Sequence, residues 1–204
     1  MHALQLNHRP LDARMRFTLD TNCIIDVEDE RPNAPFVRDL VALHGVNGTN
    51  VAVSSIGASE RQRTGGYASN FSEFKSKLAA SGFAALELLP PPAYWGLCFW
   101  DHFVWADGND TLEREIHNIL FPSIEFLWPD YAEARRLPVD SQDKNWRNAK
   151  CDVLGLWCHI KHGGGVFVTS DTNFYAETKI EKLQALGAGT IARPKDALAL
   201  AKNQ

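Results

Sequence analysis

Short apolar runs alternate along this chain with segments in which apolar residues recur every three or four positions. The short runs predict strands at 15–19, 51–55, 166–168 and near 189–192. The stretch "ALELL" fits either a strand or the end of a helix. The helical spacing predicts helices at 34–44, from Ile56 onward, and at 70–80, 109–121, 129–137, 142–162, 176–186 and 194–203. Strands that alternate with helices indicate an α/β fold whose mostly parallel sheet is covered on both faces.

Residues 90–138 interrupt this alternation. The stretch "PPPAYWGLCFWDHFVW" concentrates proline and aromatic residues, and five of the six tryptophans fall between residues 95 and 146. Such a stretch is more often core than a surface on which bases stack. We therefore expect a single domain over 1–204, in which 90–138 is an aromatic-rich helical insertion with a small core of its own.

Composition and charge narrow the class of protein. The 204 residues are 45% hydrophobic and 23% charged, as in an ordinary globular domain. No stretch approaches the roughly 20 apolar residues of a membrane span, and the first 14 residues resemble a loose leader rather than a secretory signal. The four cysteines form no C-x-x-C pair, so we expect reduced thiols and a cytoplasmic protein. The net charge of −4 argues against a broadly basic surface, but it allows a local one.

Two acids stand at the ends of predicted strands. Asp20 follows "RFTL" and Asp171 follows "VFVTS", and each acid opens the tripeptide Asp-Thr-Asn. Taken alone, either tripeptide is explained by a turn, because Asp and Asn hydrogen-bond their own backbone there. Parallel sheets, however, bind ligands outside the carboxyl ends of their strands. Both acids are expected at that edge.

Two further acids belong to predicted helices. Glu60 follows Ile56 by four residues, so both lie on one helix face, and it does not occupy the capping position. A surface glutamate paired with a nearby arginine is the alternative. Asp152 lies at the edge of the apolar stripe formed by Val153, Leu156 and Trp157. A carboxylate in that half-buried position needs a partner.

Four carboxylates in one place repel one another. At ~4 Å and an effective dielectric constant near 20, each pair costs about 4 kcal/mol. A divalent cation removes this cost, and oxygen ligands select the hard ions Mg²⁺ or Mn²⁺. Such a centre suits the attack of water on a phosphodiester.

The order of these acids resembles the PIN-domain family of metal-dependent nucleases. The resemblance rests on "LDTN", "SSIGASE", "CDVLGLW" and "FVTSDTNF", which lie in the matching strand and helix contexts. It implies a three-layer α/β/α sandwich, an acidic quartet of Asp20, Glu60, Asp152 and Asp171, and cleavage of single-stranded RNA. It also implies that Asn22, Thr169 and Asn173 are supporting polar residues. Many bacterial members are toxins with a protein antitoxin, but the 90–138 segment departs from those compact proteins.

The expected partners are single-stranded RNA, an antitoxin if the chain is a toxin, and a second copy of the chain, with no membrane. The candidate phosphate contacts are Arg61, Arg63, Lys144, Arg147, Lys150 and Lys179. Two rival functions remain open, namely a catalytically idle module that binds RNA or protein and a structure-specific DNA nuclease. Zinc at Cys158, His159 and His162 is disfavoured because these residues do not share a helix face. The acidic stretch 26–30 is expected to be a solvated turn, and the alternative for Asp26 is a hydrogen bond to a residue that binds the metal.

Overall fold

The computed structural model describes residues 15–59, 70–99, 102–105 and 110–203. The expected leader 1–14 lies outside these residues. The chain forms one five-stranded sheet with the order β3-β2-β1-β4-β5, and every neighbouring pair is parallel. The strands are β1 (Arg16–Leu19), β2 (Asn50–Ser54), β3 (Glu87–Leu89), β4 (Val166–Val168) and β5 (Thr190–Ala192). The predicted α/β class with a parallel sheet is confirmed.

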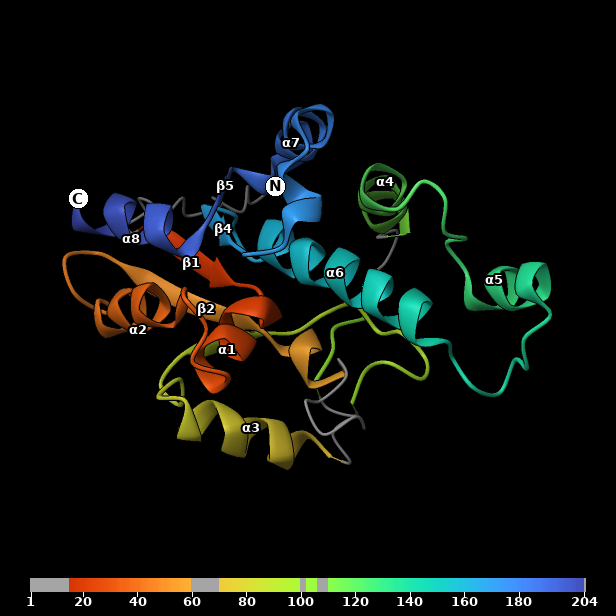
Figure 1. The fold of residues 1–204 in the computed structure, drawn as a ribbon, viewed down its shortest axis with the longest axis horizontal. Helices are drawn as coiled ribbons and strands as arrows, with labels where there is room; N and C mark the ends of the chain where they lie inside the picture. Colours follow the sequence, from red (N-terminus) through yellow and green to blue (C-terminus); the bar gives the residue numbers. More distant parts are fainter. Residues whose placement is uncertain (1–14, 60–69, 100–101, 106–109, 204) are drawn as a thin grey trace, which may run out of the picture.

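Helices cover both faces of this sheet, so the molecule has three layers (Figure 1). One face packs against α1 (Thr21–Glu28), α2 (Ala34–Ala42), α3 (Phe71–Ala80) and α8 (Pro194–Lys202). The other face packs against α4 (Asp110–Leu120), α6 (Lys144–Lys161) and α7 (Glu177–Leu183). α5 (Trp128–Arg135) lies beyond the sheet, near the start of α6 (Figure 1).

Alternation along the central strand explains why both faces are buried. Phe17 and Leu19 of β1 belong to the core under α1 and α2, while Thr18 points to the opposite face. There the Nδ1 atom of His159 in α6 accepts the Thr18 hydroxyl at 2.9 Å, and its Nε2 donates to the Ala188 carbonyl at 3.0 Å. Burial lowers the pKa of His159 to about 4. A neutral imidazole therefore fastens α6 to the middle of the sheet.

The sequence prediction missed α1. Residues 26–30 were expected to be a solvated turn, yet α1 continues through Asp26, and this side chain is 3% exposed. Asn33 donates to Asp26 Oδ2 at 3.1 Å, which supplies the hydrogen bond that a buried carboxylate requires. The apolar face of Cys23, Ile24 and Val27 holds the helix against the sheet. Asp26 therefore has a structural partner of its own.

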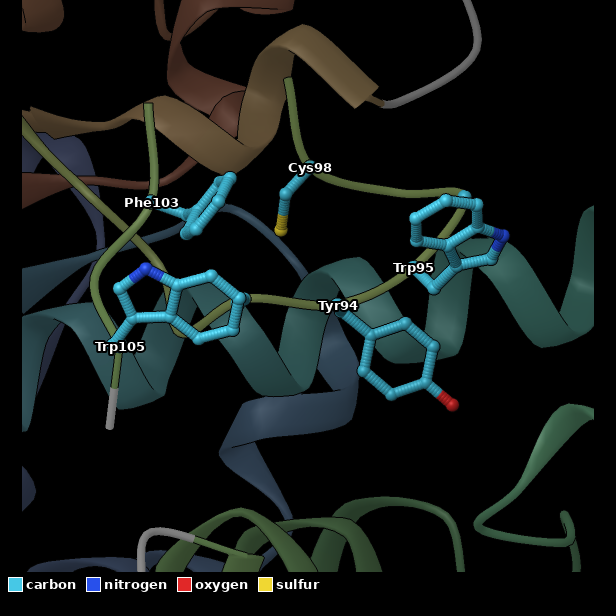
Figure 2. A pocket seen from close by; sticks show the side chains of 7 residues that line it. Tyr94, Trp95, Cys98, Phe103 and Trp105 are labelled. Atoms are coloured by element: carbon cyan, nitrogen blue, oxygen red, sulfur yellow. The ribbon is translucent and has the colours of Figure 1, made fainter. Parts of the chain in front are cut away.

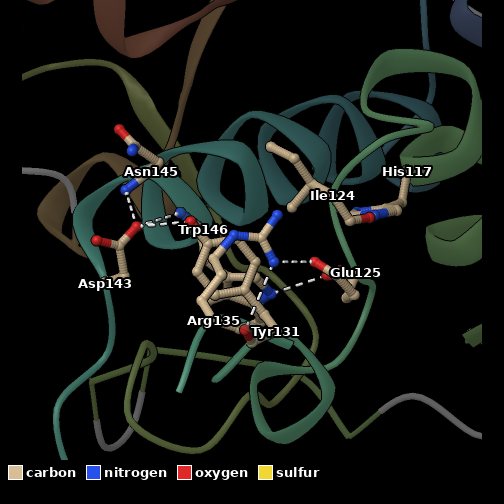
Figure 3. Close-up of polar contacts among 8 residues, drawn as sticks. All are labelled: His117, Ile124, Glu125, Tyr131, Arg135, Asp143, Asn145 and Trp146. Carbon is tan, nitrogen blue, oxygen red and sulfur yellow. Dashed lines mark hydrogen bonds and ion pairs between the residues drawn. The ribbon is translucent and has the colours of Figure 1, made fainter. Parts of the chain in front are cut away.

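The aromatic insertion contributes to a small core but does not form it alone. Leu97, Trp128, Tyr131 and Ala132 come from the insertion, whereas Ile56, Trp146, Cys151 and Leu154 lie outside it. Figure 3 shows how α5 is attached to the start of α6: Tyr131 donates to Asp143 at 2.9 Å, and the same carboxylate caps α6. α4 differs, because its Ile116 and Leu120 belong to the core that faces the sheet. The 90–138 segment is therefore built partly into the main fold.

Two expectations about membranes and cysteines can be compared with the structure. None of the helices in the described ranges is long and apolar enough to cross a bilayer. All four cysteines are free, three of them buried and Cys98 half-buried.

Candidate active site at the carboxyl edge of the sheet

The strand order places a topological switch point between β1 and β4. From β1 the chain proceeds through β2 to β3 on one side, whereas β4 and β5 lie on the other side. Open parallel sheets bind ligands where the strand order reverses in this way, outside the carboxyl ends of the strands. Asp20 directly follows β1, and Thr169 directly follows β4. The two strand ends that carry the Asp-Thr-Asn tripeptides are therefore neighbours.

Asp20 is held from both strands. Its side chain is buried, with 3% of the residue exposed. Oδ1 accepts the backbone N–H of Thr21 at 2.8 Å, which caps α1. Oδ2 accepts the Asn22 amide at 3.1 Å and the Thr169 hydroxyl at 2.7 Å. The last bond comes from the neighbouring strand end, so Asp20 is more than a helix cap.

Thr169 joins Asp20 to Asp171. Its hydroxyl oxygen donates to Asp20 and accepts the backbone N–H of Asp171 at 3.0 Å. Asp171, which is half-buried, accepts the backbone N–H of Asn173 at 2.8 Å and caps the short 3₁₀ helix η2 (Thr172–Tyr175). Asn22 and Thr169 thus both donate to Asp20, whereas the side-chain contacts of Asn173 are with Leu120 and Lys179, and the predicted supporting roles of all three residues stay predictions.

The electrostatics of Asp20 favour a nearby cation. Burial raises the pKa of the Asp20 carboxyl above its usual value, the hydrogen bonds from Thr169, Asn22 and Thr21 oppose this effect, and the negative charge of Asp171 adds to it. The anion at Asp20 is therefore costly without a positive charge close by. The donors are carboxylate oxygens, which suit a hard divalent ion.

α6 passes Asp20 at Gly155, at a distance where a Cβ atom would make only ordinary van der Waals contacts. A Cβ atom at Gly155 would lie 4.0 Å from Asp20 Oδ1 and 3.8 Å from Cγ2 of Ile56. Asp152 precedes Gly155 by three residues and is half-buried on the same side of the helix. Asp152 thus lies on the helix face that turns toward Asp20. Sequence reasoning overlooked Gly155, although a glycine inside an apolar helical stripe signals close packing.

Glu60, Arg61 and Arg63 lie outside the described residues, so their predicted roles stay predictions. The preceding segment, η1 (Ser55–Ser59), follows β2 as a short 3₁₀ helix. A Cβ at Gly57 would lie 2.7 Å from Oγ1 of Thr21, so η1 packs directly on the start of α1. Among the described residues, which exclude Glu60, no group of three or more His, Cys, Asp and Glu side chains is close enough to hold a metal.

The candidate phosphate contacts have different environments. Lys179 donates to the Leu120 carbonyl at 3.0 Å and to Oδ1 of Asn173, which places an ammonium beside the Asp171 loop. Lys144 is exposed at the start of α6. Arg147 is half-buried and donates to backbone carbonyls of η1 and of the 93–98 segment.

Lys150 does not fit its predicted role as a phosphate contact. The residue is 1% exposed, and its ammonium forms an ion pair with Glu113 of α4. The ammonium also lies 3.7 Å from the ring centre of Phe126 and 4.4 Å from that of Tyr94. Enclosed in this way, Lys150 connects α4 to α6 and has no access to a nucleic acid.

His162, one of the residues of the disfavoured zinc site, lies at the end of α6. Its Nε2 atom donates to the Pro90 carbonyl at 3.0 Å.

Thr169→Val is expected to weaken metal binding. The substitution keeps the shape of the buried side chain but removes the hydroxyl between the two acids and leaves the Asp171 N–H without its acceptor. Loss of such a supporting bond typically costs about 10- to 100-fold in metal affinity. Calorimetric titration with Mn²⁺ measures the change. Thr18→Val is the matched control, because it removes an equally buried hydroxyl that contacts His159 instead. Equal Mn²⁺ affinity in the two variants would contradict the assigned role.

The described geometry thus comprises the Asp20 carboxylate bonded to Thr169, the Asp171 backbone bonded to the same hydroxyl, α6 in contact range at Gly155, and the Lys179 ammonium beside the Asp171 loop. This arrangement can neutralise a cation and orient water near a phosphate. No protein-family model matches the chain, and no curated protein matches it in sequence.

Proposed function

We propose that this protein is a metal-dependent endoribonuclease that hydrolyses single-stranded RNA. The observation that carries the proposal is the buried Asp20 carboxylate at the switch point of a parallel sheet, hydrogen-bonded to Thr169, whose hydroxyl also accepts the backbone N–H of Asp171. The resemblance of the acidic motifs to PIN-domain nucleases supports the same reading. The free cysteines suit a cytoplasmic protein. The proposal includes a toxin whose nuclease activity is inhibited by an antitoxin protein.

In this proposal Asp20, Asp152, Asp171 and Glu60 hold Mg²⁺ or Mn²⁺. The bound ion supplies an activated water and offsets negative charge at the phosphate. Asn22 and Thr169 fix the orientation of the Asp20 carboxylate, because both donate to its Oδ2 atom. The buried position of Asp20 keeps water away from its anion and strengthens its attraction for a cation.

The cations at the rim hold the RNA backbone. Lys179 lies beside the Asp171 loop through its bond to Asn173, so its ammonium is placed to contact a phosphate next to the centre. Lys144 adds a further positive charge at the exposed start of α6. Binding through such contacts weakens as salt rises, since phosphate-bound counterions are released on association.

The test is cleavage of end-labelled substrates with Mg²⁺, with Mn²⁺ or with a chelator. Single-stranded RNA, duplex RNA and flapped DNA are compared at equal concentration, and Mn²⁺ binding is followed by calorimetry and by the melting temperature. Cleavage of single-stranded RNA only with metal supports the proposal. Cleavage restricted to flapped DNA would replace it by a DNA nuclease. Absence of cleavage together with absence of Mn²⁺ binding would leave an idle binding module.

A further inference from the structure

Two tryptophans of the 90–138 segment are almost fully exposed. Trp95 is 86% exposed and Trp105 is 83% exposed, whereas Trp128, Trp146 and Trp157 are at most 6% exposed. An exposed indole gains nothing from the core, and a cluster of exposed aromatic rings marks an interaction surface. The described tryptophans therefore divide into three that hold the fold together and two that face solvent.

Both exposed indoles line one hollow, which we name the aromatic groove. It is formed by residues 93–96 and Cys98 together with Phe103 and Trp105 and has a volume of about 470 Å³, within the range of sites for small ligands. Figure 2 shows Trp105 and Phe103 on one side of the groove and Trp95 on the other, with Tyr94 and Cys98 between them. Its lining is mainly aromatic, so it presents ring faces rather than hydrogen-bonding groups.

The walls of the aromatic groove are tied together. Ala93 donates to the Val104 carbonyl at 3.0 Å, and Val104 donates to the Pro91 carbonyl at 2.9 Å. These bonds pair the two segments that carry the indoles. The ring of Phe103 meets that of Trp105 edge-on at 5.3 Å. A groove fixed in this way loses little conformational entropy when a ligand binds.

Arg147 connects the aromatic groove to the candidate active site. Its guanidinium donates to the Gly96 carbonyl at 3.0 Å and to the Ser59 carbonyl at 2.8 Å. Ser59 ends η1, which leaves β2 at the same carboxyl edge of the sheet as Asp20. Arg147 and Trp95 also line a second, adjoining hollow. The guanidinium of Arg147, which also donates to Gln142 at 3.2 Å, therefore lies between a hollow that contains an exposed indole and the end of η1.

We propose that the aromatic groove binds an unpaired base of the RNA substrate by stacking on Trp95 and Trp105, with Arg147 contacting the adjacent phosphate. The inference depends on the proposed nuclease function and assigns a substrate subsite to it. Single-stranded RNA combines exposed base faces with a negative backbone, and proteins bind it by aromatic platforms beside cations. Aromatic rings and a guanidinium occur together here. A protein partner would use the apolar rings without needing the cation, which is why RNA is favoured.

The test measures RNA binding without cleavage. A fluorescent single-stranded 12-nucleotide RNA is titrated with the full chain in the presence of a chelator, and the anisotropy gives Kd. Trp95→Ala and Trp105→Ala are each expected to raise Kd by about 5- to 100-fold, the usual range for one lost stacking contact. Trp95→Phe is expected to stay within about threefold of the unmodified chain, because a ring face remains. A ribose-phosphate oligomer of equal length that lacks bases should bind all these proteins equally weakly.

Val46→Ala is the matched control, since Val46 is an exposed apolar residue at 45% in the loop before β2, at the opposite edge of the sheet. It should leave Kd unchanged, and the thermal melts of all variants should coincide. Unchanged Kd in both tryptophan variants, with RNA still cleaved by the unmodified chain, overturns the groove assignment alone and leaves a protein as its ligand. If the unmodified chain neither binds nor cleaves RNA, both the groove assignment and the proposed nuclease function are wrong.

Discussion

Asp20→Asn is expected to reduce metal-dependent RNA cleavage by at least about 10³-fold, equivalent to roughly 4 kcal/mol of barrier. The amide removes the anion that we assign to the cation, while the shape of the side chain is kept. Asparagine is also a favourable N-cap residue, so the first turn of α1 keeps its cap. The rates of the two proteins are compared under single-turnover conditions with Mn²⁺ and a single-stranded RNA.

Stability measurements separate loss of chemistry from loss of fold. The amide oxygen can take the place of only one carboxylate oxygen, so one of the N–H donors from Thr21 and Asn22 loses its acceptor, and the variant is expected to melt slightly lower than the unmodified chain in chelator while it still unfolds in one cooperative transition. A ligand that binds only the folded state raises the melting temperature, and Mn²⁺ should do so for the unmodified chain but not for the variant.

Asp26→Asn is the matched control for this experiment. Asp26 is an equally buried aspartate of the same helix, but its hydrogen bond comes from Asn33 rather than from Thr169. This variant should retain cleavage and the Mn²⁺ response. Equal cleavage by the Asp20→Asn protein and the unmodified chain would end the assignment of Asp20 to the active site.

Lys150→Ala is expected to destabilise the fold by about 3–5 kcal/mol, because removal of one partner leaves a buried charge uncompensated. The change removes the cation that pairs with the Glu113 carboxylate, whose side chain is 10% exposed. It also leaves a cavity beside the rings of Phe126 and Tyr94, where the lysine ammonium lay. Such a loss is a large fraction of the stability of a typical domain, about 5–15 kcal/mol. Urea unfolding followed by circular dichroism measures it.

A second variant distinguishes the lost ion pair from a general intolerance of the position. Lys150→Met combined with Glu113→Gln removes both charges and keeps similar volumes, so it should recover most of the lost stability. The exposed pair Arg38 and Glu30 serves as a control, and Arg38→Met should have no measurable effect. If Lys150→Ala were as stable as the Arg38 variant, the enclosed position of Lys150 would be wrong.

Most elements could be predicted because their signals are local. The apolar runs of β1, β2 and β4 and the periodicity of α6 are visible in a few consecutive residues. α1 was missed for the opposite reason. Its acidic residues indicate a solvated turn, but Asn33 and Arg31 bind the Asp26 carboxylate, and the sheet beneath Val27 makes a buried helix favourable. Tertiary contacts thus decided an element that local preference disfavoured.

In the candidate site, too, some features follow from local sequence signals and others depend on tertiary contacts. The rule that ligands lie at the carboxyl ends of parallel strands predicted Asp20 and Asp171 at one edge of the sheet, and Thr169 bonds there to the Asp20 carboxylate and to the backbone N–H of Asp171. The rule could not predict which lysines stay in solvent. Lys150 resembles any charged helix residue in the sequence, and its partner Glu113 lies in another helix. Burial of a charge depends on partners that no short window contains.

The bond between Thr169 and Asp20 spans 149 positions of the chain. Ribosomes release the N-terminal strand first, so β1 emerges long before β4 exists to pair with it. Contacts of such long range form slowly, since the intervening polymer must close first. During synthesis the Asp20 carboxylate consequently lacks its Thr169 hydrogen bond until at least 149 further residues have been added to the chain.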